Sequence, residues 1–158
     1  MDWFVKRFLQ SALVWLGLGV TLGVAMAVFP LLVIYRPAHM HMNFLGFVTM
    51  MIYGVGYHVI PRFFGQKLRY RALAGAHWWI SNCGLALMVV GFMLAPHMGR
   101  RSAPVLAVGG ILSALGAFFF IVNVWRTMDV PALVPRTERA PPSRRLPLDA
   151  SVQMSVNP

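Results

Sequence analysis

Hydrophobic residues are gathered in four long runs separated by short polar stretches. The runs cover residues 8–35, 37–60, 72–95 and 105–125. Each is close to or longer than the ~20 residues with which a helix crosses ~30 Å of hydrocarbon. Lys6 and Arg7 precede the first run as they do in a signal peptide, but its length favours a retained helix. The pattern predicts an all-α fold, an integral membrane four-helix bundle over residues 1–127.

The composition changes after the fourth run. Residues 128–158 are rich in proline and arginine and hold few bulky apolar side chains. Such a composition is typical of a disordered segment that cannot bury enough apolar surface to fold alone. We therefore expect a second region here, a cytoplasmic tail that orders only by docking on a partner or on a second copy.

Charge refines the topology. The 158-residue chain is 58% hydrophobic and carries a formal net charge of +10. Its cations lie in the segments that flank the apolar runs, and positive-inside counting places both termini and the middle loop in the cytoplasm. We expect a multi-pass protein of a bacterial-type inner membrane, with the cations facing anionic lipid rather than nucleic acid.

The second apolar run has two unlike faces when it is projected as a helix. One face is apolar and includes His41, which is expected to face lipid or a partner subunit. The other is polar or small, so His39 is expected to face the bundle. The second face comprises His39, Asn43, Gly46 (or Phe47), Met50, Gly54, Tyr57 and Pro61.

The third and fourth runs also carry small residues at helical spacing. Such ridges let transmembrane helices approach closely. In the third run the small and polar face begins at His77, and in the fourth run the small residues lie upstream of a phenylalanine block. The first set is His77, Ser81, Gly84, Met88, Gly91 and Ala95, and the second is Gly109, Gly110, Ser113, Ala114, Gly116 and Ala117.

Histidines and methionines are the only plausible ligands within the runs. All four acidic residues lie outside them, which argues against a cation-coupled pump. Cys83 is the single cysteine, so neither a disulfide nor a thiolate metal site is expected. The acids are Asp2, Asp129, Glu138 and Asp149.

The five histidines fall at two depths. His39, His41 and His97 belong to the outer side, whereas His58 and His77 belong to the inner side. His39 and His58 are ~28 Å apart along a helix axis, so one iron cannot bind both. A bis-histidine haem would pair His39 or His41 with His97, or His58 with His77, or would take one histidine from each of two chains.

Axial ligation of haem b is the chemistry that we favour for these histidines. His39 is the first candidate, because it lies on the small-residue face and follows Arg36, a natural partner for a haem propionate. His97 is the second candidate. His41, His58 and His77 are ranked lower, as interfacial histidines bonded to water and headgroups. Copper is a weaker alternative, suggested by the His39-Met40-His41-Met42 sequence.

Two segments of the second run resemble a known family. Arg36-Pro37-Ala38-His39 and Tyr57-His58-Val59-Ile60-Pro61-Arg62 look like the second helix of haem–copper oxidase subunit I, of the C-type oxidase and nitric oxide reductase type. Trp78-Trp79-Ile80-Ser81-Asn82 resembles the start of its third helix. The resemblance is to the N-terminal four helices of the superfamily and implies that His39 binds a low-spin haem b.

The later helices of that family carry the second haem ligand and the binuclear centre. The resemblance therefore implies no complete oxidase here, and a second ligand from His97, a second copy or another protein. We expect electron transfer between a quinol or periplasmic donor and a redox partner, in a homo-oligomer or larger redox complex. Arg36 would hold a propionate, and Asn43, Gly46 and Gly54 would line the haem cavity. The alternatives are a cofactor-free accessory subunit and a haem-based gas sensor.

Overall fold

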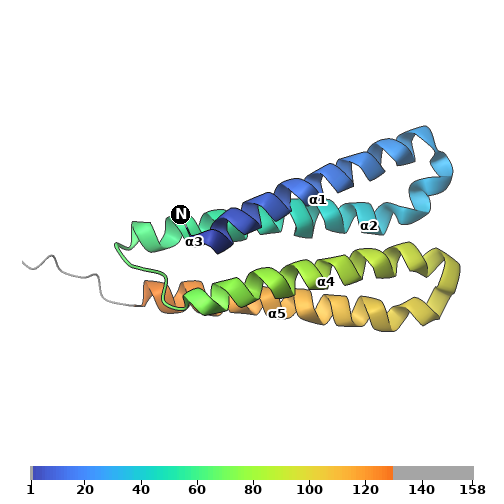
Figure 1. Ribbon diagram of the computed structural model, residues 1–158. Helices are drawn as coiled ribbons and strands as arrows, with labels where there is room; N and C mark the ends of the chain where they lie inside the picture. The colour runs from blue at the N-terminus through green and yellow to red at the C-terminus, as the bar shows by residue number, and fades with distance from the viewer. Residues whose placement is uncertain (1, 130–158) are drawn as a thin grey trace, which may run out of the picture.

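The computed structural model describes residues 2–129 and contains helices and connecting segments but no β-strand in this range (Figure 1). The predicted all-α fold is thus confirmed for these residues. The predicted tail lies outside the described residues from residue 130 onward. In chain order the elements are α1 (Trp3–Val28), η1 (Pro30–Tyr35), α2 (Arg36–His41), η2 (Met42–Thr49), α3 (Met50–Phe63), α4 (Arg71–Met98), η3 (Gly99–Ser102) and α5 (Ala103–Met128).

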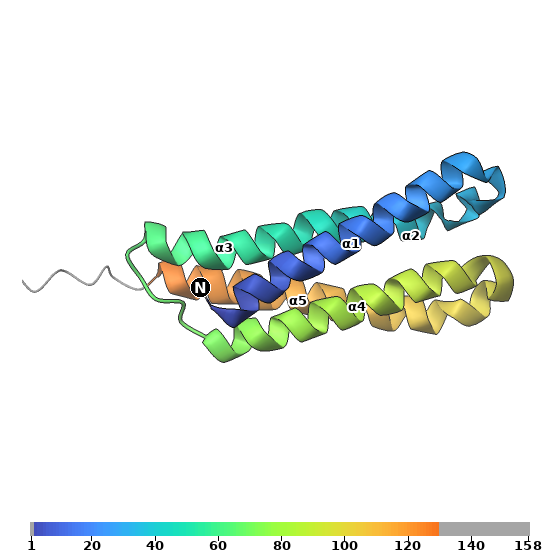
Figure 2. The same cartoon turned by 45° about the horizontal axis from the view of Figure 1, so that its top comes forward.

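Three continuous helical stretches are long and apolar enough to cross a membrane. They are Trp3–Val28, Pro30–Phe63 and Arg71–Met128, with 26, 34 and 58 residues. The third comprises α4 and α5, which lie side by side because the chain reverses at η3 (Figures 1 and 2). The reversal begins at Gly99, whose φ of 52° is strained for any residue with a Cβ.

Proline ends the first helix earlier than the apolar pattern predicted. Phe29 is extended, with φ −121° and ψ 92°, and Pro30 opens the short 3₁₀ segment η1. Proline disfavours the helical conformation of the residue before it, so α1 cannot continue past Val28. The boundary predicted at residue 35 is therefore wrong. Pro37, in the first turn of α2, occupies a position where its missing N–H costs nothing.

The segment η2 is a π-helix rather than an α-helix. Its wider turn is visible in one side-chain bond, in which the Thr49 hydroxyl donates to the carbonyl of Phe44, five residues earlier, at 2.8 Å. Widened turns of this kind often occur at functional sites. The predicted inward face is confirmed within this segment and in α3, where its members are buried: Gly46, Met50, Gly54, Tyr57 and Pro61.

The helices pack as two pairs. α1 lies mainly against η2 and α3, whereas α4 lies along α5 (Figure 2). A Cβ on Gly84 would lie 2.7 Å from the Ser113 backbone nitrogen, and one on Gly109 would lie 2.6 Å from that of Met88. The α4 and α5 backbones are therefore in direct contact. The predicted ridges form this seam through Gly84, Gly109 and Gly116, whereas Gly110 lies off it, with nothing within 4 Å of a Cβ there.

The outer surface of the bundle is apolar and its charges gather at the ends. Large hydrophobic side chains such as Leu31 and Ile111 are mostly exposed, as expected where lipid covers the helices. More basic residues lie at the end that holds the start of α1 and the α3–α4 loop than at the opposite end (Figure 1). The first group is Lys6, Arg7, Arg62, Lys67, Arg69, Arg71 and Arg126, and the second is Arg36, Arg100 and Arg101.

Candidate functional site

His39 faces α1, as its place on the small-residue face predicted. Its Nδ1 lies 2.8 Å from the carbonyl oxygen of Gly19. A carbonyl can only accept a hydrogen bond, so Nδ1 carries the proton. In a neutral imidazole this leaves the lone pair on Nε2, the atom that would bind a metal. Nε2 has no hydrogen-bond partner among residues 2–129.

Two glycines of α1 make room for this arrangement. A Cβ on Gly23 would lie 2.9 Å from Cε1 of His39, and one on Gly19 would lie 2.6 Å from the Asn43 amide nitrogen. That nitrogen donates to the His39 carbonyl at 2.8 Å. Its 3.3 Å approach to His39 Nδ1 brings two donors together, so we assign the hydrogen bond to the carbonyl. The α1 glycines thus hold His39 and Asn43 against the α1 backbone.

Gly46 and Gly54 face α1 side chains. A Cβ on Gly46 would lie 2.7 Å from Cγ of Trp15, and one on Gly54 would lie 3.0 Å from Cδ2 of Leu9. Both glycines therefore serve the packing of α1 on the second helical stretch. Their predicted role in lining a haem cavity stays a prediction, and it would require Trp15 and Leu9 to move.

Arg36 and His97 lie at the same end of the bundle as His39. Arg36 is exposed, and its guanidinium has no partner among residues 2–129. Nε2 of His97, in the last turn of α4, lies 2.7 Å from the hydroxyl of Tyr35. The structure thus joins His97 to Tyr35, the residue before Arg36, and records no contact between His97 and His39.

His41 contacts α4 but stays partly exposed, so its predicted position facing lipid or a partner stays a prediction. Its ring lies 4.6 Å from that of Phe92 of α4, centroid to centroid, and its Nδ1 bonds to the carbonyl of Pro37 at 2.8 Å. The widened turn that follows changes the helical register on which the prediction depended. Met40 is exposed whereas Met42 is buried. The potential copper ligands of residues 39–42 therefore diverge, and residues 2–129 contain no cluster of three His, Cys, Asp or Glu side chains able to hold a metal.

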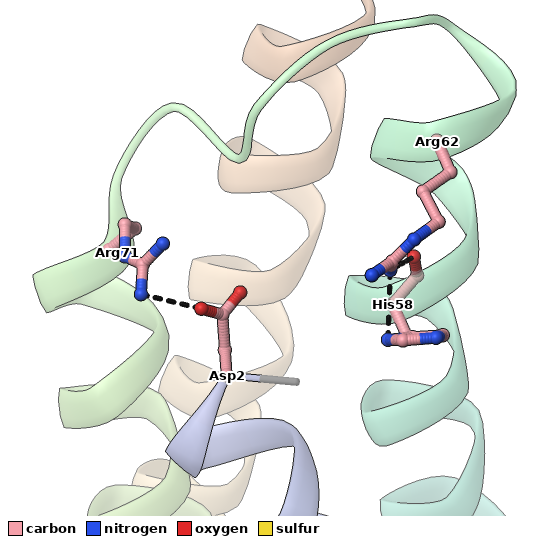
Figure 3. A network of polar contacts seen from close by, with 4 residues as sticks. All are labelled: Asp2, His58, Arg62 and Arg71. Atoms are coloured by element: carbon pink, nitrogen blue, oxygen red, sulfur yellow. Dashed lines mark hydrogen bonds and ion pairs between the residues drawn. The ribbon is translucent and has the colours of Figure 1, made fainter.

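His58 lies near the basic end of the bundle (Figure 3). Arg62, one turn later on α3, donates to its Nδ1 at 2.8 Å. Asp2 and Arg71 form a 2.5 Å ion pair nearby, which ties the start of α1 to the start of α4. These contacts agree with the predicted interfacial position of His58.

His77 was ranked as an interfacial histidine, and that prediction is wrong. It is fully buried, and its Nδ1 lies 3.0 Å from the hydroxyl of Tyr57. Rings of Phe8, Tyr53 and Phe120 surround it, with centroids between 4.5 and 6.1 Å away. Its Nε2 has no hydrogen-bond partner in the described part of the chain. The small and polar face that it shares with Ser81 and Gly84 was the sequence signal for this burial.

Comparison with known proteins gives one informative similarity. No family model matches the chain, and no solved structure does. A curated relative, the cbb3-type cytochrome c oxidase subunit CcoN1 of Stutzerimonas stutzeri, is 22% identical over an alignment 155 residues long, and the alignment covers 79% of this chain and 33% of the relative. The chain thus spans about a third of that relative's length. The similarity supports the haem–copper oxidase superfamily resemblance and, with the apolar helices, indicates a membrane protein related to a redox complex.

Proposed function

We propose that this chain is a membrane-embedded b-type haem protein for electron transfer, related to haem–copper oxidase subunit I but without its binuclear centre. The observation that carries the proposal is the bond from His39 Nδ1 to the Gly19 carbonyl. Ligating histidines are commonly fixed by such a bond, which sets the tautomer and the ring orientation. The similarity to the oxidase subunit supports the same assignment. When bound, haem b supplies a one-electron carrier whose potential depends on its axial ligands.

The second axial ligand comes from outside the chain in this proposal. Nε2 of His97 already bonds to Tyr35, so using His97 as the ligand would require breaking that bond. His39 of a second copy, or a histidine of a larger redox complex, meets no such obstacle. We therefore propose a homo-oligomer or larger complex in which the haem lies at an interface between chains.

The unpartnered guanidinium of Arg36 fits the predicted role of holding a haem propionate. It lies three residues before His39, at the exposed end of the same helical stretch. Arginine binds carboxylates by two parallel hydrogen bonds, and burial against a haem would strengthen them. Asn43 would act indirectly, because its amide holds the His39 carbonyl rather than the imidazole.

We further propose four membrane crossings, formed by α1, the stretch Pro30–Phe63, α4 and α5. Seven basic residues of the described range lie at the end with the start of α1, and three lie at the other. The positive-inside rule then assigns both termini to the cytoplasmic face of a bacterial-type inner membrane. The exposed apolar surface would face the lipid bilayer.

An optical spectrum tests the haem proposal. The purified protein should show a Soret band and a reduced-minus-oxidised b-type band. His39→Ala should abolish both, whereas His58→Ala should leave them intact because His58 is held by Arg62 at the opposite end. A haem-to-chain ratio measured on the same sample should be one haem per two chains if His39 is used twice. A spectrum unchanged by His39→Ala would remove His39 from the site.

A second candidate function is a cofactor-free accessory subunit of a membrane redox complex. It is favoured by the packing at Gly46 and Gly54, where Trp15 and Leu9 occupy the space that a porphyrin would need. Unchanged haem content of the purified native complex after His39→Ala would select this function over the first.

A further inference from the structure

A groove lined by both polar and apolar side chains opens between α1 and α4. Its volume is about 270 Å³. Two indoles, Trp15 and Trp78, lie among its walls. Its lining residues are Arg7, Gln10, Ser11, Val14, Trp15, Trp78 and Asn82. The volume is close to the lower end of small-molecule sites, so the groove suits one substituted ring and is too small for a porphyrin.

Hydrogen bonds between α1 and α4 hold the indoles in place. Nε1 of Trp78 donates to the Ser11 hydroxyl at 3.0 Å, and Nε1 of Trp15 donates to the Asn82 side-chain oxygen at 3.2 Å. The Asn82 amide nitrogen in turn donates to the Trp78 carbonyl at 2.8 Å. Both indole N–H groups and the Asn82 amide are thereby used within the protein. The walls are preformed, which lowers the ordering cost of binding a ligand.

The remaining polar groups of the groove are hydrogen-bond donors. Within the described range, Arg7 and Gln10 have no partner, and the Ser11 hydroxyl hydrogen has no acceptor. Both side chains are exposed, and Gln10 lies within the apolar run that begins at residue 8. A polar group that faces hydrocarbon without a partner costs free energy. A ligand with several hydrogen-bond acceptors would provide a partner for Arg7, for Gln10 and for the Ser11 hydroxyl.

The depth of the groove residues along α1 and α4 distinguishes a lipid phosphate from a neutral ring as the ligand. At 1.5 Å per residue, Arg7 lies about 6 Å and Gln10 about 10 Å from the start of α1 at Trp3. Asn82 lies about 16 Å from the start of α4 at Arg71. A lipid phosphate stays at the level of the headgroups, above most of this groove. A neutral ring with carbonyl oxygens and an apolar tail can reach it.

We propose that the α1–α4 groove binds the head ring of a membrane quinone or quinol, with its oxygens accepting hydrogen bonds from Arg7, Gln10 and Ser11. The apolar tail leaves the groove past Val14 into lipid. A role of this ligand as electron donor rests on the haem function proposed above. Binding itself does not, since every group involved belongs to α1 and α4.

Tryptophan fluorescence tests the binding directly. The full chain in phosphatidylcholine nanodiscs, with or without haem, is titrated with decylubiquinone. We expect saturable quenching. Gln10→Leu and Arg7→Gln should each raise the dissociation constant at least fivefold, while Arg101→Gln, a charge-matched control at the opposite end, should leave it unchanged. The quenching measurement needs no haem. Failure of the haem proposal would therefore appear in the optical spectrum alone, and failure of the quinone site would appear in the quenching alone.

Two outcomes would overturn the quinone site. One is quenching that neither Gln10→Leu nor Arg7→Gln alters, which would mean that the quinone partitions into lipid without using the groove. The other is displacement of decylubiquinone by an equal mole fraction of phosphatidylglycerol in a manner that depends on Arg7. That result would assign the groove to a lipid phosphate.

Discussion

His39 is locked to the backbone of α1, because its Nδ1 bonds to the carbonyl of Gly19 at 2.8 Å while its ring rests on Gly23. One contact therefore fixes the tautomer, and the other fixes the distance between the first two helical stretches. Both depend on the absence of side chains at two positions of α1. These two contacts of His39 can be tested without knowing what His39 binds.

Gly23→Ala should displace His39. The added Cβ would lie 2.9 Å from Cε1 of the imidazole, closer than real side chains come. We expect a loss of about 1–3 kcal/mol in the free energy of unfolding, typical of overpacking, and a shifted His39 resonance in NMR spectra. Gly17→Ala is the matched control, since nothing lies within 4 Å of a Cβ there. Equal effects of the two substitutions would contradict the contact.

Gly84→Ala should separate α4 from α5. The new Cβ would meet the Ser113 backbone nitrogen at 2.7 Å, and backbone cannot rotate away as a side chain can. The melting temperature in detergent should fall by several degrees. Gly110→Ala, on α5 but in open space, should leave it nearly unchanged. If Gly84→Ala is tolerated as well as Gly110→Ala, the helices do not meet along this seam.

Tyr57→Phe should destabilise the protein more than Tyr53→Phe. Both rings pack on His77, but only the Tyr57 hydroxyl bonds to its Nδ1, at 3.0 Å. Removing that hydroxyl leaves a buried imidazole nitrogen without a partner, at a cost of about 1–3 kcal/mol. Chemical denaturation of the two variants measures the difference. A larger loss for Tyr53→Phe would mean that ring packing, and not the hydrogen bond, dominates at His77.

The ion pair between Asp2 and Arg71 should contribute little. The Arg71 side chain is 65% exposed and that of Asp2 is 30% exposed, so water and salt screen the pair. We expect Asp2→Asn to cost less than about 1 kcal/mol, and added salt to reduce even that difference. A cost above about 2 kcal/mol that is insensitive to salt would show that the pair orders the start of α1 in a buried environment.

Much of the fold followed from the apolar pattern. The inward face from Gly46 to Pro61 and the glycine seam of α4 and α5 are where helical spacing placed them, since both depend on local periodicity. The early end of α1 was missed because the run stays apolar through Pro30. The contact of His41 with Phe92 was not predicted, because an α-helical projection does not include a widened turn.

The candidate site was predicted less completely. The approach of His39 to α1 could be predicted, but its bond to the Gly19 carbonyl depends on how two helices cross, which one sequence does not encode locally. His77 was misplaced because histidine suits a wet boundary so well. Its burial follows from rings contributed by α1, α3 and α5, which meet only after the bundle has formed.

The π-helical segment at residues 42–49 separates α2 from α3. Its wider turns place the side chains of α2 differently around the axis than one continuous α-helix would. A π-helix holds an extra residue by widening its turn, so deleting one residue there would let the segment rewind as an α-helix with His39 still on the Gly19–Gly23 ridge. Deleting one residue from α3, which is already α-helical, would instead rotate everything upstream by about 100° and take His39 off that ridge. The widened turn, more than the identity of its residues, thus sets how the two ends of the second stretch are oriented toward each other.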